Sequence, residues 1–251
     1  MRVCLILIAI LFLFKPGEAQ VSPKKIEARL ANLLKQHCDN YCQDEEYLDA
    51  FSKKFIYCLN NYNFTIKYPF EKLKSLEFQT LTSPDSLVRI YSWPGVQGGD
   101  SFWTEDAIQY STNDKVHAYI TDSNSNEAYF TFDTLNDSGK VYYILIKDGG
   151  GACMSTASVR IFTIENGKLN TRAKIIKTKS GLTSNIIVDY NYCDTPDSIL
   201  ISKRNEKVDF IEYDVSKRII YIPIVTENMV MTTNHMTYKF DTIEHCFKRI
   251  F

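Results

Sequence analysis

Residues 158–169, Ser-Val-Arg-Ile-Phe-Thr-Ile-Glu-Asn-Gly-Lys-Leu, decide the fold class of this chain. The first seven, Ser158–Ile164, are mostly β-branched or aromatic, which is typical of a strand. They lead into Glu165-Asn166-Gly167-Lys168, and an Asn-Gly pair beside such a run is the strongest short-range signal of a β-hairpin. The stretch therefore predicts a strand that ends in a tight hairpin turn.

Runs of the same kind continue on both sides of this stretch, from about Leu76 to the end of the chain. They are short and are separated by turn residues, without helical patterns between them. Closely spaced strands of this kind predict an antiparallel meander rather than parallel βαβ units. The predicted strands are Phe78–Thr82, Leu87–Trp93, Ala107–Tyr110, Val116–Thr121, Ala128–Phe132, Val141–Lys147, Ser158–Ile164, Ala173–Lys177, Ile186–Tyr190, Ser198–Lys203, Val208–Tyr213, Ile219–Ile224, Met236–Phe240 and Cys246–Ile250.

The region before these strands has the spacing of two helices. Ser22-Pro23 predicts a helix start, because a capping side chain is followed by proline in the first turn. Apolar residues recur at helical spacing from Ile26 to His37, and a second helical pattern begins near Asp44. The short connection predicts an antiparallel helical hairpin, which forms an N-terminal region over residues 20–68.

The predicted fold class is therefore mainly β, with an N-terminal α-helical hairpin and an antiparallel β domain over residues 69–251. The number of predicted strands exceeds what one open sheet carries easily. A closed barrel, a sandwich and blade-like sheets all remain compatible with the pattern.

The first nineteen residues have the layout of a secretory signal peptide. Arg2 gives a positive start, Val3–Phe14 is apolar, and Gly17-Glu18-Ala19 places small residues at the cleavage-determining positions. The apolar run is shorter than the roughly 20 residues that span a bilayer, and no later run approaches that length. We expect export to the periplasm or the extracellular space, and a soluble mature protein without a membrane span.

The charge balance bears on the class of partner. Lysine and arginine number 29, aspartate and glutamate 30, and the formal net charge is −1 at pH 7. A nucleic-acid-binding protein leaves a strongly basic footprint, which this composition lacks. We therefore expect no nucleic-acid partner.

Six of the 7 cysteines follow the predicted signal peptide, and an even number in an exported chain favours disulfides. Cys153 and Cys193 are the disulfide candidates. Cys38 and Cys42 could pair with each other across a distorted turn between the helices, or one of them could reach the β region. The alternative for Cys153, which follows Gly149-Gly150-Gly151-Ala152, is a nucleophile with backbone N–H groups as an oxyanion hole.

The least ordinary passage is a glycine-rich loop flanked by the two tryptophans of the chain. Paired aromatic rings beside such a loop form a stacking platform for a sugar ring or an apolar ligand. The alternative is that the tryptophans fill the core while the glycines permit tight turning. The predicted ligand-binding residues are Tyr91, Trp93, Gly98, Gly99 and Trp103.

The same passage resembles a family of uncharacterised secreted proteins of Bacteroidetes-type bacteria. The resemblance is carried by residues 83–93, Ser-Pro-Asp-Ser-Leu-Val-Arg-Ile-Tyr-Ser-Trp, with Gly98-Gly99 and Ile108-Gln109-Tyr110, and it covers about Tyr68 to Phe251. This chain departs from the family pattern at Asp100, where threonine is usual. The resemblance implies export and a β-rich body, and it carries no known activity or functional residue.

No motif specifies a reaction, a cofactor or a metal site. We expect a non-catalytic binding or interaction module whose partner is an unknown ligand or an envelope protein, and not an enzyme. One alternative is an extracellular hydrolase with a site built from distant aspartates, histidines or Cys153; another is a purely structural envelope protein. The scattered aspartates are Asp106, Asp133, Asp148, Asp189 and Asp194.

Overall fold

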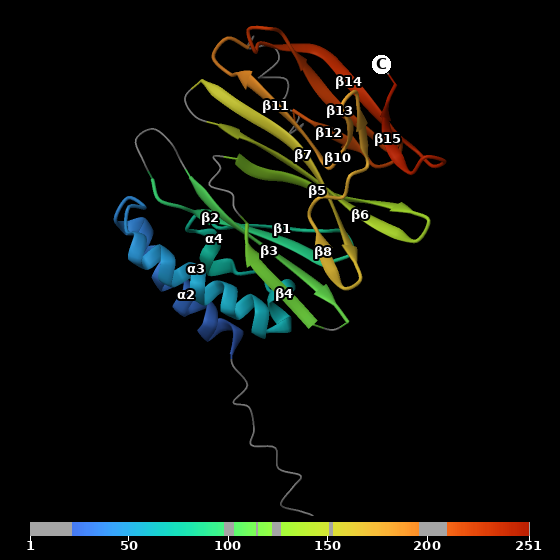
Figure 1. The fold of residues 1–251 in the computed structure, drawn as a ribbon. Helices are drawn as coiled ribbons and strands as arrows, with labels where there is room; N and C mark the ends of the chain where they lie inside the picture. Colours follow the sequence, from blue (N-terminus) through green and yellow to red (C-terminus); the bar gives the residue numbers. More distant parts are fainter. Residues whose placement is uncertain are drawn as a thin grey trace, which may run out of the picture.

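The computed structural model describes residues 22–97, 103–113, 115–121, 127–150, 153–195 and 210–250. The predicted signal peptide and the predicted strand Ser198–Lys203 lie outside these residues. Within them, two helices lie beside three open, mostly antiparallel sheets (Figure 1). The mainly β class and the N-terminal helical hairpin are thus confirmed.

The two long helices begin where the sequence predicts. Helix α2 spans Pro23–Asp39, with proline in its first turn, although the Ser22 side chain makes no capping hydrogen bond. Helix α3 spans Glu45–Asn61, and the Asp44 carboxylate accepts hydrogen bonds from two backbone N–H groups of its first turn. The Ser22 side chain is therefore not a cap, whereas Asp44 satisfies two donors that a helix start leaves unpaired.

Short helical turns connect this hairpin to the first sheet. Helix η1 is a 3₁₀ turn over Asn63–Ile66, and α4 spans Glu71–Lys74. The first sheet has the strand order β1-β2-β3-β4 and is antiparallel throughout. Its strands are β1 (Gln79–Thr82), β2 (Val88–Pro94), β3 (Thr104–Thr112) and β4 (Lys115–Ile120).

The second sheet has the order β11-β7-β6-β5, with β8 paired to β7, and the third has the order β10-β9-β15-β14-β13-β12. In the third sheet, β15 and β9 form a parallel pair. The strands of the second sheet are β5 (Glu127–Asp137), β6 (Lys140–Gly150), β7 (Met154–Glu165), β8 (Lys168–Asn170) and β11 (Asn185–Asn191). Those of the third are β9 (Ile176–Thr178), β10 (Gly181–Thr183), β12 (Glu212–Asp214), β13 (Ile219–Val225), β14 (Met231–Asp241) and β15 (Cys246–Arg249).

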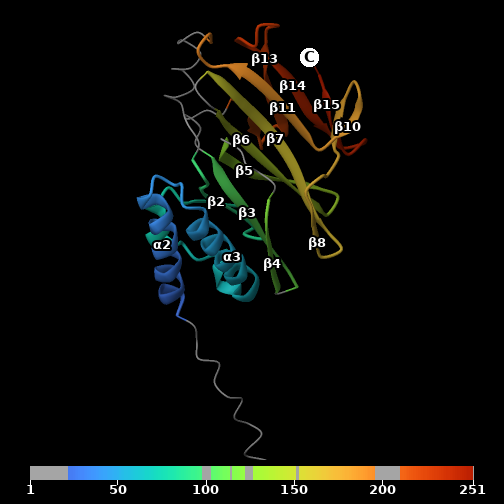
Figure 2. The ribbon, with the colours of Figure 1, turned by 60° about the vertical axis from the view of Figure 1, so that its left-hand side comes forward.

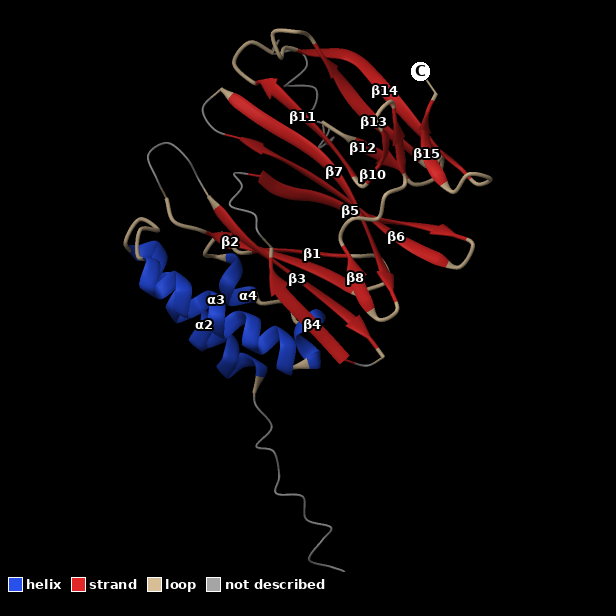
Figure 3. Cartoon of the chain, viewed as in Figure 1, coloured by secondary structure: helices blue, strands red, loops and turns tan. Residues whose placement is uncertain are grey.

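Helices and sheets stack as four layers, in the order helices, first sheet, second sheet, third sheet (Figures 2 and 3). Alternate residues of β2 point to opposite faces of the first sheet. Tyr91 and Trp93 pack against the helices, whereas Ile90 packs against the second sheet. Strand β6 does the same, because Leu145 faces the first sheet and Ile144 the third. Of the three architectures left open by the sequence, the stack of open sheets is closest to a sandwich.

An ion pair joins the first sheet to the second. The Lys147 ammonium of β6 lies 3.1 Å from the Asp106 carboxylate of β3, and both side chains are fully buried. Charges so deeply buried are found almost only when paired.

The outer edge of the first sheet is occupied by a side chain. The Asn60 amide of α3 donates to the Ala118 carbonyl of β4 and accepts from the Ala118 N–H, both at 2.8 Å. It therefore forms the pair of bonds that a neighbouring strand would form.

Candidate functional site

The predicted aromatic platform is built largely of core residues. Tyr91 and Trp93 have no exposed surface, and Trp93 contacts the rings of Phe51 and Phe55 from α3. Trp103, just before β3, is 38% exposed, and Gly98 and Gly99 lie outside the described residues. Neither buried ring offers a face to a ligand, so the core alternative describes Tyr91 and Trp93.

The polar atoms of these two rings have partners inside the protein. The Tyr91 hydroxyl donates to Gln109 Oε1 at 2.6 Å, and the Trp93 indole N–H donates to Glu105 at 3.2 Å. Burial raises the pKa of Tyr91, so its phenol stays neutral. Both rings therefore have satisfied polar groups, as is usual for buried tyrosine and tryptophan.

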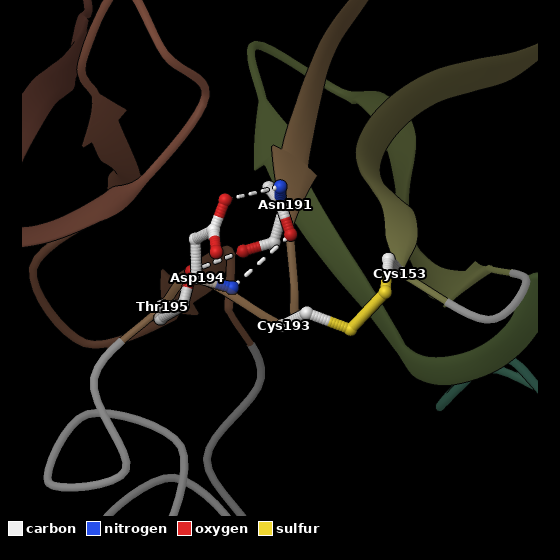
Figure 4. Close-up of a disulfide and its surroundings, with 5 residues drawn as sticks. All are labelled: Cys153, Asn191, Cys193, Asp194 and Thr195. Atoms are coloured by element: carbon white, nitrogen blue, oxygen red, sulfur yellow. Dashed lines mark hydrogen bonds between the residues drawn. A yellow bond between two sulfur atoms is a disulfide. The ribbon is translucent and has the colours of Figure 1, made fainter.

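The disulfide prediction is confirmed. Cys153 and Cys193 form a disulfide with their Cα atoms 5.1 Å apart, so Cys153 carries no free thiol in this state (Figure 4). Cys38, Cys42, Cys58 and Cys246 are free.

The disulfide sits beside a hydrogen-bonded turn after β11. The Asn191 amide donates to the Asp194 carboxylate at 2.7 Å, and the Thr195 hydroxyl donates to the Asn191 carbonyl at 2.6 Å (Figure 4). The Asn191 N–H donates to the Met229 carbonyl between β13 and β14. This turn thus connects the second sheet to the third.

The aspartates of the hydrolase alternative occupy separate positions. Asp106 pairs with Lys147, and Asp148 accepts from the Tyr190 hydroxyl at 2.9 Å on the other side of β6. Asp189 accepts from Thr156 at the surface. No group of three or more histidine, cysteine, aspartate or glutamate side chains suited to a metal ion lies within the described residues.

A groove of about 670 Å³ lies between the two long helices. Its lining residues follow one stripe on each helix, spaced three or four residues apart, and Tyr62 lies beyond the end of α3. Ile26 and Cys58 are buried at its base, Leu33 is half-buried, and Tyr57 is 59% exposed. The lining residues are Ile26, Arg29, Leu33, Ala50, Lys53, Lys54, Tyr57, Cys58 and Tyr62.

The charged residues that line this groove are all basic. Lys53 pairs with Asp49 at 2.6 Å on the exposed side of α3. Arg29 and Lys54 are exposed and make no ion pair with any residue in the described ranges. The groove therefore combines an apolar base with two cations available to an outside partner.

The sequence predictions missed this groove, although its signal is present. Ala50, Lys53, Lys54 and Tyr57 follow the i, i+3, i+4, i+7 spacing of one helix face. That face lies beside the apolar stripe of α3 that packs into the core. Because it carries two lysines, it resembles the ordinary solvent-exposed side of an amphipathic helix.

None of the helices that the structure describes is both long and apolar enough to cross a membrane. Comparisons with protein-family models, with curated proteins and with solved structures found no match. The family resemblance therefore stays a prediction.

Proposed function

We propose that this protein is an exported, non-catalytic interaction module that binds an acidic amphipathic helix of a partner protein. The site is the groove between α2 and α3. The observation that carries the proposal is the combination of an apolar base with Arg29 and Lys54, two exposed cations that have no ion pair among the described residues.

The chemistry of the groove favours a helical partner. An amphipathic helix buries apolar side chains at positions i, i+3, i+4 and i+7 in a groove of this kind. Leu33 and Tyr57 offer partly exposed apolar surface to such anchors from opposite walls. Acidic residues beside the anchors would then lie near Arg29 and Lys54, and this complementarity would favour acidic over basic helices.

Export is supported by two features. The Cys153–Cys193 disulfide is typical of oxidising compartments, and the first nineteen residues have the layout of a signal peptide. We accordingly expect the partner to be an envelope or extracellular protein.

Binding of a synthetic helix tests the proposal. The probe is a fluorescent peptide with leucines at i, i+3, i+4 and i+7 and glutamates beside them, and the measurement is fluorescence anisotropy. We expect the double variant Arg29→Glu/Lys54→Glu to weaken binding at least about tenfold, which is ~1.4 kcal/mol. We also expect Tyr57→Ala to weaken binding, because its exposed ring would lose the contact.

The matched control is Lys24→Glu/Lys35→Glu, which makes the same change in net charge at exposed positions of α2 that do not line the groove. It should bind the peptide as the natural protein does. Equal loss in both double variants would refute the groove as the site, as would equal binding of a peptide in which lysines replace the glutamates.

A further inference from the structure

Arg89 of β2 is a buried cation, with only 5% of its surface exposed. Its Nη1 group donates to three backbone carbonyls around η1, and the shortest of these bonds is 2.6 Å, to Tyr68. Its Nη2 group donates to the Thr80 hydroxyl at 2.9 Å. The Nε–H group has no partner among the described residues.

The charge of Arg89 is not neutralised by any residue that the structure describes. No carboxylate in the described ranges lies within ion-pair distance of the guanidinium. The Tyr91 ring lies 5.2 Å away, but its phenol is neutral because burial raises its pKa. Carbonyl dipoles and aromatic faces supply partial negative charge only, and a buried cation without a counter-ion is costly.

A polar pocket of about 330 Å³ opens beside this guanidinium, between the η1–α4 segment and strands β1 and β2. Lys67 and Lys74 line it with Arg89; Lys74 also pairs with Glu71 at 2.9 Å, and Lys67 makes no ion pair with a described residue. Hydroxyl groups complete the wall. The lining residues are Ile66, Lys67, Pro69, Lys74, Thr80, Thr82, Ser86 and Arg89.

We infer that this pocket binds a phosphate group. Three cations and three hydroxyl groups line it, and one of the cations, Lys74, also pairs with Glu71, which is not a lining residue. This set matches the charge and the acceptor oxygens of a phosphate dianion. The ligand would supply the countercharge that Arg89 lacks. The pocket shares no lining residue with the groove between α2 and α3, so the phosphate proposal can be tested independently of the helix-binding proposal.

Calorimetric titration of the full chain with inorganic phosphate tests this site. Arg89 holds the backbone of residues 65–68, so its variants would report folding as well as binding. The exposed lysines therefore carry the test: we expect Lys67→Gln/Lys74→Gln to weaken phosphate binding about tenfold. Lys168→Gln/Lys239→Gln, at exposed positions of β8 and β14, is the matched control and should bind as the natural protein does.

Titrations with sulfate, acetate and chloride at the same ionic strength separate binding from screening. Preference for phosphate, lost in the pocket variant alone, supports the site. An equal response to all four anions overturns it, and so does unchanged phosphate binding in Lys67→Gln/Lys74→Gln.

Discussion

At the scale of single residues, Tyr213 of β12 combines burial with an unsatisfied polar atom. Only 6% of its surface is exposed, its ring packs edge-on against Phe247, and its hydroxyl has no hydrogen-bond partner among the described residues. Burial raises the pKa of Tyr213 to about 12. A group whose pKa is higher in the folded state stabilises that state below its unfolded pKa, and this contribution is lost as the pH rises through the folded pKa.

We therefore predict a specific alkaline effect of Tyr213→Phe. At neutral pH the variant should equal or exceed the natural protein in stability by up to about 1 kcal/mol, since no buried hydroxyl is left unsatisfied. Between about pH 10 and 12 its advantage should grow, because phenylalanine does not ionise. Urea unfolding at a series of pH values measures this.

Tyr57→Phe is the control for that series, because Tyr57 is 59% exposed. An advantage of the same size and pH dependence in Tyr57→Phe would show that the effect of Tyr213→Phe does not come from burial. A Tyr213→Phe variant whose unfolding midpoint falls by the same amount at every pH would contradict the assignment.

Residue type alone separated core from surface poorly. Tyr91 and Trp93 were predicted as ligand-binding because aromatic residues suit both roles. Their burial depends on two layers that cover β2, and one of these, the helical hairpin, is formed by residues far away in the sequence. Cys153 and Cys193 were easier to predict, since the compartment implied by the N-terminus favours pairing.

At the scale of elements, the β7–β8 hairpin turns through two residues with positive φ. Asn166 has φ 51° and Gly167 has φ 73°, as the Asn-Gly pair predicts for a turn of this kind. A Cβ atom at Gly167 would approach nothing closer than Thr112 Oγ1 at 3.9 Å. Any cost of a side chain there is therefore conformational rather than steric crowding by neighbours.

Gly167→Ala should destabilise the protein by about 1 kcal/mol, the cost of holding a residue with a Cβ atom in the left-handed region. Gly167→Asn should recover part of that loss, because asparagine tolerates this region better. Chemical denaturation of the two variants and the natural protein gives the comparison. Identical midpoints for alanine and glycine would show that the turn relaxes to another conformation.

Local pattern predicted elements better than it predicted their ends. Helices α2 and α3 and most strands lie where periodicity placed them, but β3, β5, β6, β7 and β14 extend further at both ends. Strands β8 and β10, of three residues each, were missed because so short a run has no period. The groove was missed because it depends on how two helices pack.

At the scale of the whole molecule, the Cys153–Cys193 disulfide links positions 40 residues apart. The loop it closes contains β7 to β11, and thus strands of both the second and the third sheet. Closing a loop of this length restricts the unfolded chain and typically stabilises a protein by about 2–4 kcal/mol. The stacking of three sheets could not be predicted, because it depends on contacts between distant segments.

Reduction should therefore lower the free energy of unfolding by about 2–4 kcal/mol. Urea unfolding with and without a thiol reductant measures the change. The variant Cys153→Ser/Cys193→Ser should match the reduced protein and should not respond to reductant. If reductant lowered the free energy of unfolding of that variant as well, a second disulfide would exist among the four remaining cysteines of the described residues.

The bond pair between Asn60 and Ala118 has a consequence for behaviour at high concentration. A strand at the border of a sheet presents unpaired N–H and C=O groups with which another polypeptide can pair. Repeated pairing of this kind leads to fibres. Here one amide group already fills the middle of that border on β4. Because this amide takes up both backbone groups of Ala118, an incoming polypeptide finds fewer partners along this border.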